Sequence, residues 1–176
     1  MYTPNNVVKR FNDLDFNKLY ASGYKIIISD LDNTLAPYTM AKPDAELIEK
    51  IQNIKKIGFK IYLISNNKKD RIKLFCDELK VDGFLSSAKK PNTKKIAVYL
   101  KTNNINLNEA IALGDQLVTD ILCFNRLGLY SVLVKTIDLK TQKWYTKINR
   151  LREKNILKKI KKDNNEIYRK IEELYE

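Results

Sequence analysis

Residues 30–35 of this 176-residue chain read Asp-Leu-Asp-Asn-Thr-Leu, and they directly follow the apolar run 24–29, Tyr-Lys-Ile-Ile-Ile-Ser. The run predicts a buried β-strand that ends in two carboxylates, Asp30 and Asp32. Residues i and i+2 of a strand point to the same side, so we expect both carboxylates to face one crevice. Two like charges this close repel unless a cation or a proton lies between them. The pair therefore indicates a metal site in which one carboxylate is a nucleophile and the other is an acid and base.

The rest of the chain alternates apolar runs with amphipathic helical patterns. The predicted strands are 25–29, 60–64, 83–85, 110–113 and 130–134, and the predicted helices are 43–57, 68–79, 93–102 and 117–127. This alternation is typical of right-handed βαβ crossovers, so we expect an α/β fold with a parallel sheet flanked by helices. Ligands bind such sheets at the carboxyl ends of the strands, near a switch in strand order.

Further polar residues lie where that edge is expected. Ser65 and Asn66 follow the strand 60–64, Lys90 lies in a Lys-Lys-Pro sequence, and Asp115 follows a strand and precedes Asp120. Each has a plain alternative, because Asp-x-Asp pairs, Ser, Asn and Asp also cap helices, and lysines and acidic residues are common on surfaces. Together and in this order they indicate phosphoryl transfer, which needs a nucleophile, a cation and positioned hydrogen-bond donors.

The composition of the chain limits which binding partners and which kinds of site are expected. The chain has 33 basic and 21 acidic residues, a formal charge of +12, and no histidine. The charge favours an anionic partner (a phosphorylated substrate, an anionic membrane surface or nucleic acid), although Lys-rich composition also follows from biased codon usage. The lack of histidine excludes a His-based triad or metal site. Cys76 and Cys123 lie in apolar helical patterns, so we expect buried, reduced thiols in a cytoplasmic protein. With no signal-peptide pattern and no run of about 20 apolar residues, it is expected to be soluble or at most peripheral at a membrane.

The end of the chain has a different character. Residues 135–176 carry 13 basic and 7 acidic side chains, which give +6 of the total +12. Apolar residues recur there at helical spacing: Trp144, Ile148, Leu151, Ile160, Ile167, Ile171 and Leu174. This pattern is typical of a helix packed on the sheet, but Trp with Lys on an amphipathic helix also suits an anionic bilayer surface. We therefore expect a single domain over residues 1–176 with a basic helical extension over about 142–176.

The four elements together resemble the motifs of the haloacid dehalogenase (HAD) superfamily of phosphatases. The longer strings resemble its subclass IIIA, of the YqeG type, which is related to mitochondrial phosphatidylglycerophosphatases. These strings are Ser65-Asn66-Asn67, Lys90-Pro91, Gly114-Asp115-Gln116-x-x-Thr119-Asp120 and Asn125-Arg126-Leu127-Gly128. The late stretch Thr146-Lys147-Ile148-Asn149-Arg150 also resembles this type. The resemblance covers almost the whole chain and implies a Rossmann-like HAD fold.

The resemblance also implies roles for single residues. Asp30 would attack phosphorus and become an aspartyl-phosphate, and Asp32 would protonate the leaving oxygen and then deprotonate water. Lys90 would neutralise charge, and Asp120 would orient Lys90 or a metal-bound water. The phosphate-binding set would be Ser65, the Asn66 amide and Thr34. Mg²⁺ would be held by Asp30, Asp115 and the backbone carbonyl of Asp32, a set of oxygen ligands that suits this ion.

Spacing bears on the substrate. About 30 residues separate Leu35 from Ser65 and about 24 separate Asn66 from Lys90, so neither interval can hold a cap domain. Members of the superfamily without a cap generally have open sites that suit bulky substrates, or take a lid from a neighbouring subunit, so the resemblance implies a bulky phosphate monoester. We therefore expect a Mg²⁺-dependent phosphatase acting on a large or membrane-borne substrate such as phosphatidylglycerophosphate. The alternatives are a small sugar phosphate or nucleotide as substrate, and, from another class, a non-enzymatic nucleic-acid-binding module, which the lack of any recognised binding motif disfavours. Oligomeric state is left open.

Overall fold

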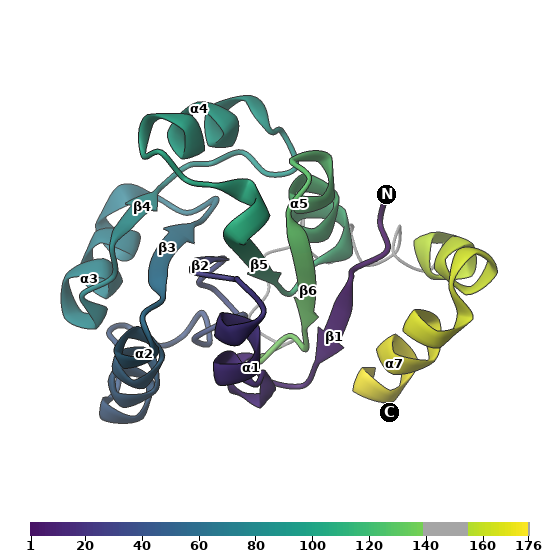
Figure 1. Ribbon diagram of the computed structural model, residues 1–176, viewed down its shortest axis with the longest axis horizontal. Helices are drawn as coiled ribbons and strands as arrows, with labels where there is room; N and C mark the ends of the chain where they lie inside the picture. Colours follow the sequence, from purple (N-terminus) through teal and green to yellow (C-terminus); the bar gives the residue numbers. More distant parts are fainter. Residues whose placement is uncertain (139–154, 176) are drawn as a thin grey trace.

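The computed structural model describes residues 1–138 and 155–175, and its centre is a six-stranded sheet (Figure 1). Every neighbouring pair of strands is parallel. Along the sheet the strands follow the order β1-β6-β5-β2-β3-β4. Their bounds are β1 Asn6–Val8, β2 Ile26–Ser29, β3 Lys60–Ile64, β4 Gly83–Leu85, β5 Ala110–Gly114 and β6 Tyr130–Val134. The predicted parallel α/β fold is confirmed.

The sheet is buried on both faces because its strands are apolar at consecutive positions. In β2, Ile27 packs into one hydrophobic core, whereas Ile26 and Ile28 pack into the other. This is the alternation of side chains that a strand imposes, and β-branched residues fit it well. β2 pairs with β3 on one side and with β5 on the other, so that Ser29 lies opposite both Leu63 and Leu113.

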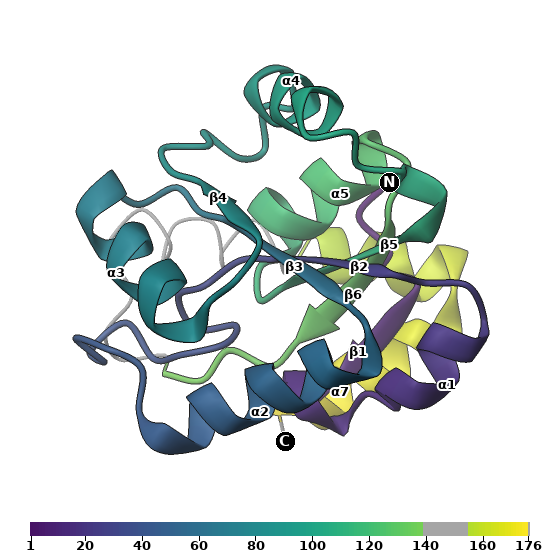
Figure 2. The same cartoon turned by 60° about the vertical axis from the view of Figure 1, so that its left-hand side comes forward.

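Helices cover both faces (Figure 2). α1 Phe16–Ala21, α2 Ala45–Ile57 and α3 Lys69–Leu79 pack in the core that contains Ile27, and α4 Lys94–Thr102 and α5 Leu122–Arg126 pack in the opposite core. α2 begins where the Asp44 carboxylate accepts a hydrogen bond from the Leu47 amide at 2.8 Å, and it ends at Gly58, whose φ of +118° suits glycine. Between β2 and β3 the chain forms a loop and α2, and between β3 and β4 it forms α3. The described residues therefore contain no cap domain at either interval.

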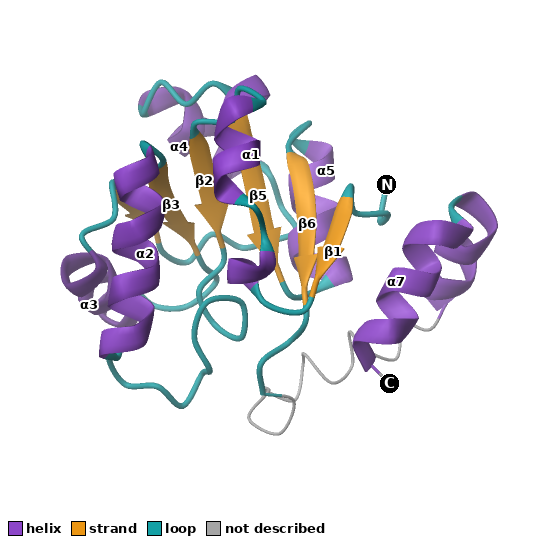
Figure 3. Cartoon of the chain, turned by 60° about the horizontal axis from the view of Figure 1, so that its bottom comes forward, coloured by secondary structure: helices purple, strands orange, loops and turns teal. Residues whose placement is uncertain are grey.

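The C-terminal helices lie beside the β1 edge of the sheet (Figure 3). Residues 155–163 are helical, and α7 spans Asn165–Tyr175. Their apolar face is buried, and it packs against Leu117, Ile121 and Leu133. The buried residues of this face are Ile156, Ile160, Ile167, Ile171 and Leu174. Packing on the sheet is thus confirmed for 155–175, whereas Trp144, Ile148, Leu151 and the string 146–150 lie outside the described residues. None of the described helices is long and apolar enough to cross a bilayer.

The structure differs from the sequence-based expectation in three segments. β1 and α1 were not predicted, because three and six residues are too few to show a clear periodicity. The predicted helix 117–127 is wrong in its first part, which is a π-helix over Leu117–Ile121 that continues into α5. In this wider turn the Asp120 carboxylate accepts a hydrogen bond from the Gln116 amide at 3.1 Å. Such turns occur often at functional sites.

Candidate active site

The strand order reverses between β2 and β5, and the residues that follow these strands meet at one edge of the sheet. Asp30 follows β2, Asp115 follows β5 and Ser65 follows β3. The Asp30 amide donates to the Leu113 carbonyl at 2.9 Å, which extends the pairing of β2 and β5 up to the site. This is the position at which open parallel sheets bind ligands.

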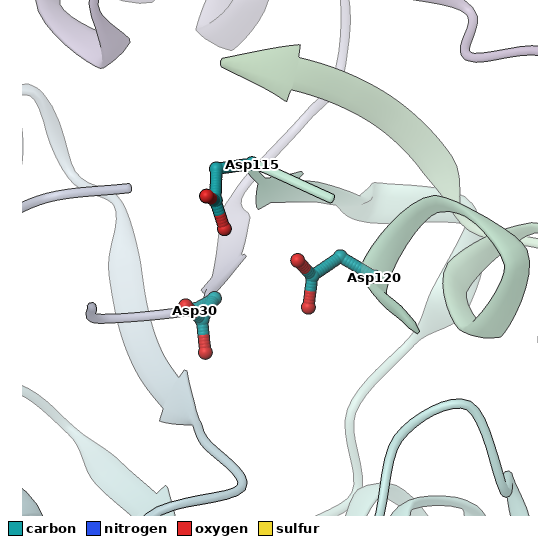
Figure 4. A group of neighbouring side chains, drawn as sticks. All are labelled: Asp30, Asp115 and Asp120. Carbon is teal, nitrogen blue, oxygen red and sulfur yellow. The ribbon is translucent and has the colours of Figure 1, made fainter. Parts of the chain in front are cut away.

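Three carboxylates point toward a shared space at this edge (Figure 4). Asp30, Asp115 and Asp120 each offer an oxygen atom, and these atoms lie within 4.8 Å of one another. All three residues are buried, with 7%, 2% and 2% of their surfaces exposed. Gly114 makes the close approach of Asp120 possible, because a Cβ at position 114 would lie 2.3 Å from the Asp120 Cβ.

Lys90 is the cation at the centre of this group. Its Nζ lies 2.7 Å from Asp30 Oδ1 and 2.7 Å from Asp120 Oδ1, and it donates to the Ile64 carbonyl at 2.9 Å. The Asn66 side chain fixes the lysine backbone: Asn66 Oδ1 accepts from the Lys90 amide at 2.7 Å, and Asn66 Nδ2 donates to the Lys90 carbonyl at 3.1 Å. Lys90 was predicted as a site residue, but this role of the Asn66 side chain was not.

Burial and charge shift the titration of this group. Burial raises the pKa of the Asp30 carboxyl to about 7, with Asp120 and Asp32 adding to the increase and Lys90 opposing it. For Lys90, burial alone would lower the pKa, but the carboxylates of Asp120 and Asp30 outweigh it and raise the pKa above its ordinary value. Lys90 is therefore a cation. Its charge only partly offsets the effect of burial and of the neighbouring carboxylates on Asp30.

The other two acidic residues are held by different partners. Asp115 Oδ2 accepts a hydrogen bond from the Thr136 hydroxyl at 3.0 Å. Asp120 uses both oxygens within the chain, Oδ1 toward Lys90 and Oδ2 toward the Gln116 amide. Asp120 is thus placed to fix Lys90.

Asp32, in the loop that follows β2, is not one of the three clustered carboxylates, and its side chain has other partners. Its Oδ1 accepts from Arg71 Nε at 2.7 Å and pairs with Arg71 Nη2 at 2.6 Å, and its Oδ2 accepts from the Asn67 side-chain amide. The Asp32 side chain is therefore held in place by an arginine that the sequence analysis did not single out.

The predicted phosphate-binding residues lie in two loops: Ser65 and Asn66 directly follow β3, and Thr34 lies in the loop after β2. Ser65 is buried, and its hydroxyl accepts from the Asn67 amide at 3.1 Å. Helix α3 begins only at Lys69, after Lys68, so Ser65 and Asn66 do not cap it. Thr34 is 1% exposed, and its Oγ1 has no hydrogen-bond partner among the described residues.

A cavity of about 300 Å³ adjoins Thr34. About half of its lining residues are apolar, and the charged ones are Arg10, Lys50, Asp44 and Glu46. The apolar and proline residues that line it are Phe11, Leu35, Pro37, Met40, Leu47, Val134 and Ile137. Ile137, which lines the cavity, directly follows Thr136, whose hydroxyl donates to Asp115.

The residues present fit a hard divalent cation. Three buried carboxylates lie together, and Lys90 pairs with two of them, Asp30 and Asp120. A buried excess of negative charge is costly unless a cation balances it. Carboxylate and carbonyl oxygens are the ligands that Mg²⁺ prefers. Asp30, Asp115 and Asp120 are thus acidic residues that could bind a metal ion.

Two residues that bind site carboxylates, Thr136 and Arg71, were not predicted, and only Thr136 carried a signal in the sequence. Thr136 comes two residues after β6, so it could have been found by extending the rule of polar residues at strand ends to that strand. Arg71 lies on the first turn of α3 among several lysines, and its contact with Asp32 spans 39 positions of the sequence. No local pattern marks such a contact.

Comparison with known proteins agrees with this geometry. The family described as "Mitochondrial PGP phosphatase" matches residues 1–137. A Bacillus subtilis protein named "Probable phosphatase YqeG" is 32% identical over 161 residues, which are 92% of each chain.

Solved structures show the same fold. An uncharacterized protein from Listeria monocytogenes serotype 4b has a TM-score of 0.51 at 20% identity, covering 62% of this chain and 77% of that one. A HAD-like family hydrolase from Porphyromonas gingivalis has a TM-score of 0.51 at 12% identity, covering 73% of this chain and 98% of that one. The resemblance seen in the sequence is confirmed, and the nucleic-acid-binding alternative is set aside. This chain belongs to the mitochondrial PGP phosphatase family and is a phosphatase.

Proposed function

We propose that this protein is a Mg²⁺-dependent phosphatase that hydrolyses a phosphate monoester through an aspartyl-phosphate on Asp30. The observation that carries the proposal is the buried Asp30 carboxylate, hydrogen-bonded at 2.7 Å to Lys90 and facing Asp115 at the strand-order switch. A carboxylate in this position can attack phosphorus, and the lysine offsets charge on both the nucleophile and the phosphoryl group. Membership of a phosphatase family supports the same reaction class.

Asp32 is proposed to transfer the proton in both steps. In the first step the bond between an Asp30 oxygen and phosphorus forms while the ester P–O bond breaks, and the leaving oxygen takes a proton from Asp32. In the second step a water attacks phosphorus and gives a proton to Asp32, while the bond between phosphorus and the Asp30 oxygen breaks. Phosphate is released and the Asp30 carboxylate is restored. Its position two residues after the nucleophile, in the loop that follows β2, supports this division of labour.

Ser65, the Asn66 backbone amide and Thr34 are proposed to hold the phosphoryl oxygens. The Ser65 hydroxyl is the acceptor in its bond with the Asn67 amide, so its own hydrogen can still be donated to an anion. The Thr34 hydroxyl has no partner among the described residues, so a phosphoryl oxygen or a water would satisfy it.

Asp30, Asp115 and the Asp32 carbonyl are proposed to hold the metal. Bound Mg²⁺ would supply positive charge to the phosphoryl oxygens and reduce the repulsion between the carboxylates. Asp120 is proposed to act on Lys90 rather than on the metal, because both of its oxygens already accept hydrogen bonds from the chain.

The substrate is proposed to be large or membrane-borne, with phosphatidylglycerophosphate as the first candidate. Three features support this: the absence of a cap domain in the described intervals after β2 and β3, the partly apolar cavity beside Thr34, and the family match. A lipid phosphate has both a charged group for the carboxylate site and an apolar part for such a cavity. The protein is further proposed to be cytoplasmic and to act at an anionic membrane surface.

A substrate panel tests the proposal. Purified protein with Mg²⁺ is assayed for phosphate release from p-nitrophenyl phosphate, from phosphatidylglycerophosphate in mixed micelles, and from sugar phosphates and nucleotides. We expect the highest kcat/KM on the lipid, and a much higher value on a small ester would move the assignment to that class.

Asp30→Asn should abolish turnover while circular dichroism and the melting curve show an intact fold. Asp77→Asn, which removes an exposed carboxylate on α3, is the control and should remain active. Most of the wild-type activity in Asp30→Asn would rule out Asp30 as the nucleophile.

A further inference from the structure

One arginine connects Asp32 to a neighbouring segment of the chain. Arg71 extends from the first turn of α3 and pairs with Asp32 through Nε at 2.7 Å and Nη2 at 2.6 Å. Its side chain is 20% exposed, and that of Asp32 is 12% exposed. A pair so shielded from water, with two nitrogen atoms on one oxygen, has a defined geometry.

The remaining donors of Arg71 bind backbone carbonyls of residues 37–40, which we call the clamped loop. Nη1 donates to the Met40 carbonyl at 2.9 Å, and Nη2 lies 3.5 Å from the Pro37 carbonyl. The guanidinium carbon lies 5.0 Å from the centre of the Tyr38 ring and 5.1 Å from that of Phe75. The guanidinium group is therefore fixed on several sides, by α3, by the clamped loop and by Asp32.

The clamped loop also borders the space around the site. Pro37 and Met40 line the cavity of about 300 Å³ beside Thr34. The clamped loop is thus joined to Asp32 through Arg71, and it also forms part of the wall of this cavity. Movement of the loop would displace both the proton-transferring carboxylate and the wall of the cavity.

We propose that Arg71 is a positioning residue, which holds the Asp32 carboxylate and the clamped loop as one unit beside the leaving group. This inference rests on the proposed role of Asp32. Arginine is needed because its planar group presents five N–H donors in fixed directions, and here they meet one carboxylate and two carbonyls. A lysine at this position would keep the charge but could not make all these contacts.

Leaving-group dependence separates positioning from general stability. Proton transfer to the leaving oxygen matters for an alkyl phosphate, whose leaving group is a poor one, and matters little for 2,4-dinitrophenyl phosphate. The comparison uses kcat/KM, which reports the step that releases the leaving group and not the later hydrolysis of the aspartyl-phosphate that both esters share. Arg71→Met should lower kcat/KM for the alkyl ester by roughly 10²-fold, the low end of what an acid–base group contributes, and by less than about 10-fold for the aryl ester. Arg71→Lys should fall between. Equal losses on both esters would overturn the proposal.

A double-mutant cycle gives a second measurement. If Arg71 acts through Asp32, Arg71→Met should cost little more once Asp32→Asn is already present. A loss of the same size in both backgrounds would mean that Arg71 acts by another route. The matched control is Lys73→Met. Lys73 is an exposed cation on the same helix, and it pairs with Asp77.

Hydrogen exchange provides a test that needs no activity. Arg71→Met should speed amide exchange in a peptide that covers residues 37–41, while peptides from the core strands β2 and β5 keep their protection. Lys73→Met should leave the loop unchanged. Unchanged loop exchange in Arg71→Met would overturn the proposal. An inactive wild-type enzyme would refute the proposed function. The exchange measurement would still test whether Arg71 holds the clamped loop, because it does not depend on activity.

Discussion

The Lys90 ammonium group lies 2.7 Å from Asp30 Oδ1, and only 2% of the lysine side chain and 10% of the aspartate side chain are exposed. The same nitrogen also reaches Asp120 and a backbone carbonyl, so Lys90 is held from three directions. The bond engages Oδ1, which makes Oδ2 the oxygen that we assign to the attack on phosphorus. A fixed cation beside the nucleophile needs no reorganisation when charge develops in the transition state.

Lys90→Met should therefore remove most of the activity and much of the stability. Removing one member of a buried ion pair leaves carboxylates without their cation and costs about 3–5 kcal/mol. Turnover should fall by on the order of 10²-fold or more, as for other preorganised charges in active sites. Urea unfolding and phosphate release measure the two effects. Lys89→Met, at the exposed neighbouring position, is the control, and a similar loss there would show that the effect is not specific to the buried cation.

The Asp30 carboxyl should make the stability of the metal-free protein depend on pH. Its pKa is about 7 in the folded chain but close to 3.9 in an unfolded one, so the folded state binds this proton more tightly. Its contribution to stability is greatest below about pH 4 and is lost as the pH rises through about 7. The free energy of unfolding of the wild type, minus that of Asp30→Asn, should thus fall over this window by on the order of a few kcal/mol.

Urea titrations in EDTA at several pH values would measure that difference. A difference that stays constant or rises between pH 4 and 8 would contradict the burial of an ionisable Asp30. Added Mg²⁺ should flatten the pH dependence, because the cation stabilises the ionised carboxylate.

Much of the fold could be predicted because its physical causes are local. Apolar runs such as Ile26–Ser29 and stops such as Gly58 mark strands and helices in the sequence itself. Parallel strands share one carboxyl edge, so the convergence of Asp30 and Asp115 followed from the order of elements alone. β1 could not be found in this way, because a strand of three residues exists only through its pairing with β6.

The parts of the site that were missed depend on packing at long range. Arg71 reaches Asp32 only because α3 lies beside the loop after β2, a relationship that the sequence around Arg71 does not contain. The π-turn before α5 is similar, since the short-range pattern at Leu117–Ile121 is that of an ordinary helix. The turn places Asp120 against Lys90, a residue 30 positions earlier in the chain.

Chelation should inactivate the enzyme, and Mg²⁺ should restore it. EDTA would leave the carboxylates of Asp30, Asp115 and Asp120 facing one another with Lys90 as their cation. Ca²⁺ should not replace Mg²⁺, because its larger and more flexible coordination shell would displace the nucleophile from phosphorus. Phosphate release after EDTA and re-addition of each ion checks this, with the melting temperature as a separate measure of binding. Full activity with Ca²⁺, or undiminished activity in EDTA, would contradict the proposed metal site.

The basic face of the C-terminal helices should bind anionic membranes by charge alone. Ile156, Ile160, Ile167, Ile171 and Leu174 are buried in the fold, so they are not available for insertion into a bilayer. Lys158, Lys159 and Lys162 remain exposed. Each lysine near an anionic surface adds roughly 1 kcal/mol, and this attraction is screened by salt. Binding should therefore require anionic lipid and should be lost at high salt.

Co-sedimentation with vesicles tests this mode of binding. The triple variant Lys158→Gln, Lys159→Gln, Lys162→Gln should lose binding to anionic vesicles at low salt and keep its melting temperature. A control with three other exposed lysines changed, Lys18→Gln, Lys60→Gln and Lys101→Gln, has the same net charge and should still bind. Equal losses in both triple variants would assign the attraction to net charge and not to this face. Binding to uncharged vesicles, or binding that survives high salt, would mean that the apolar face leaves the sheet and enters the bilayer.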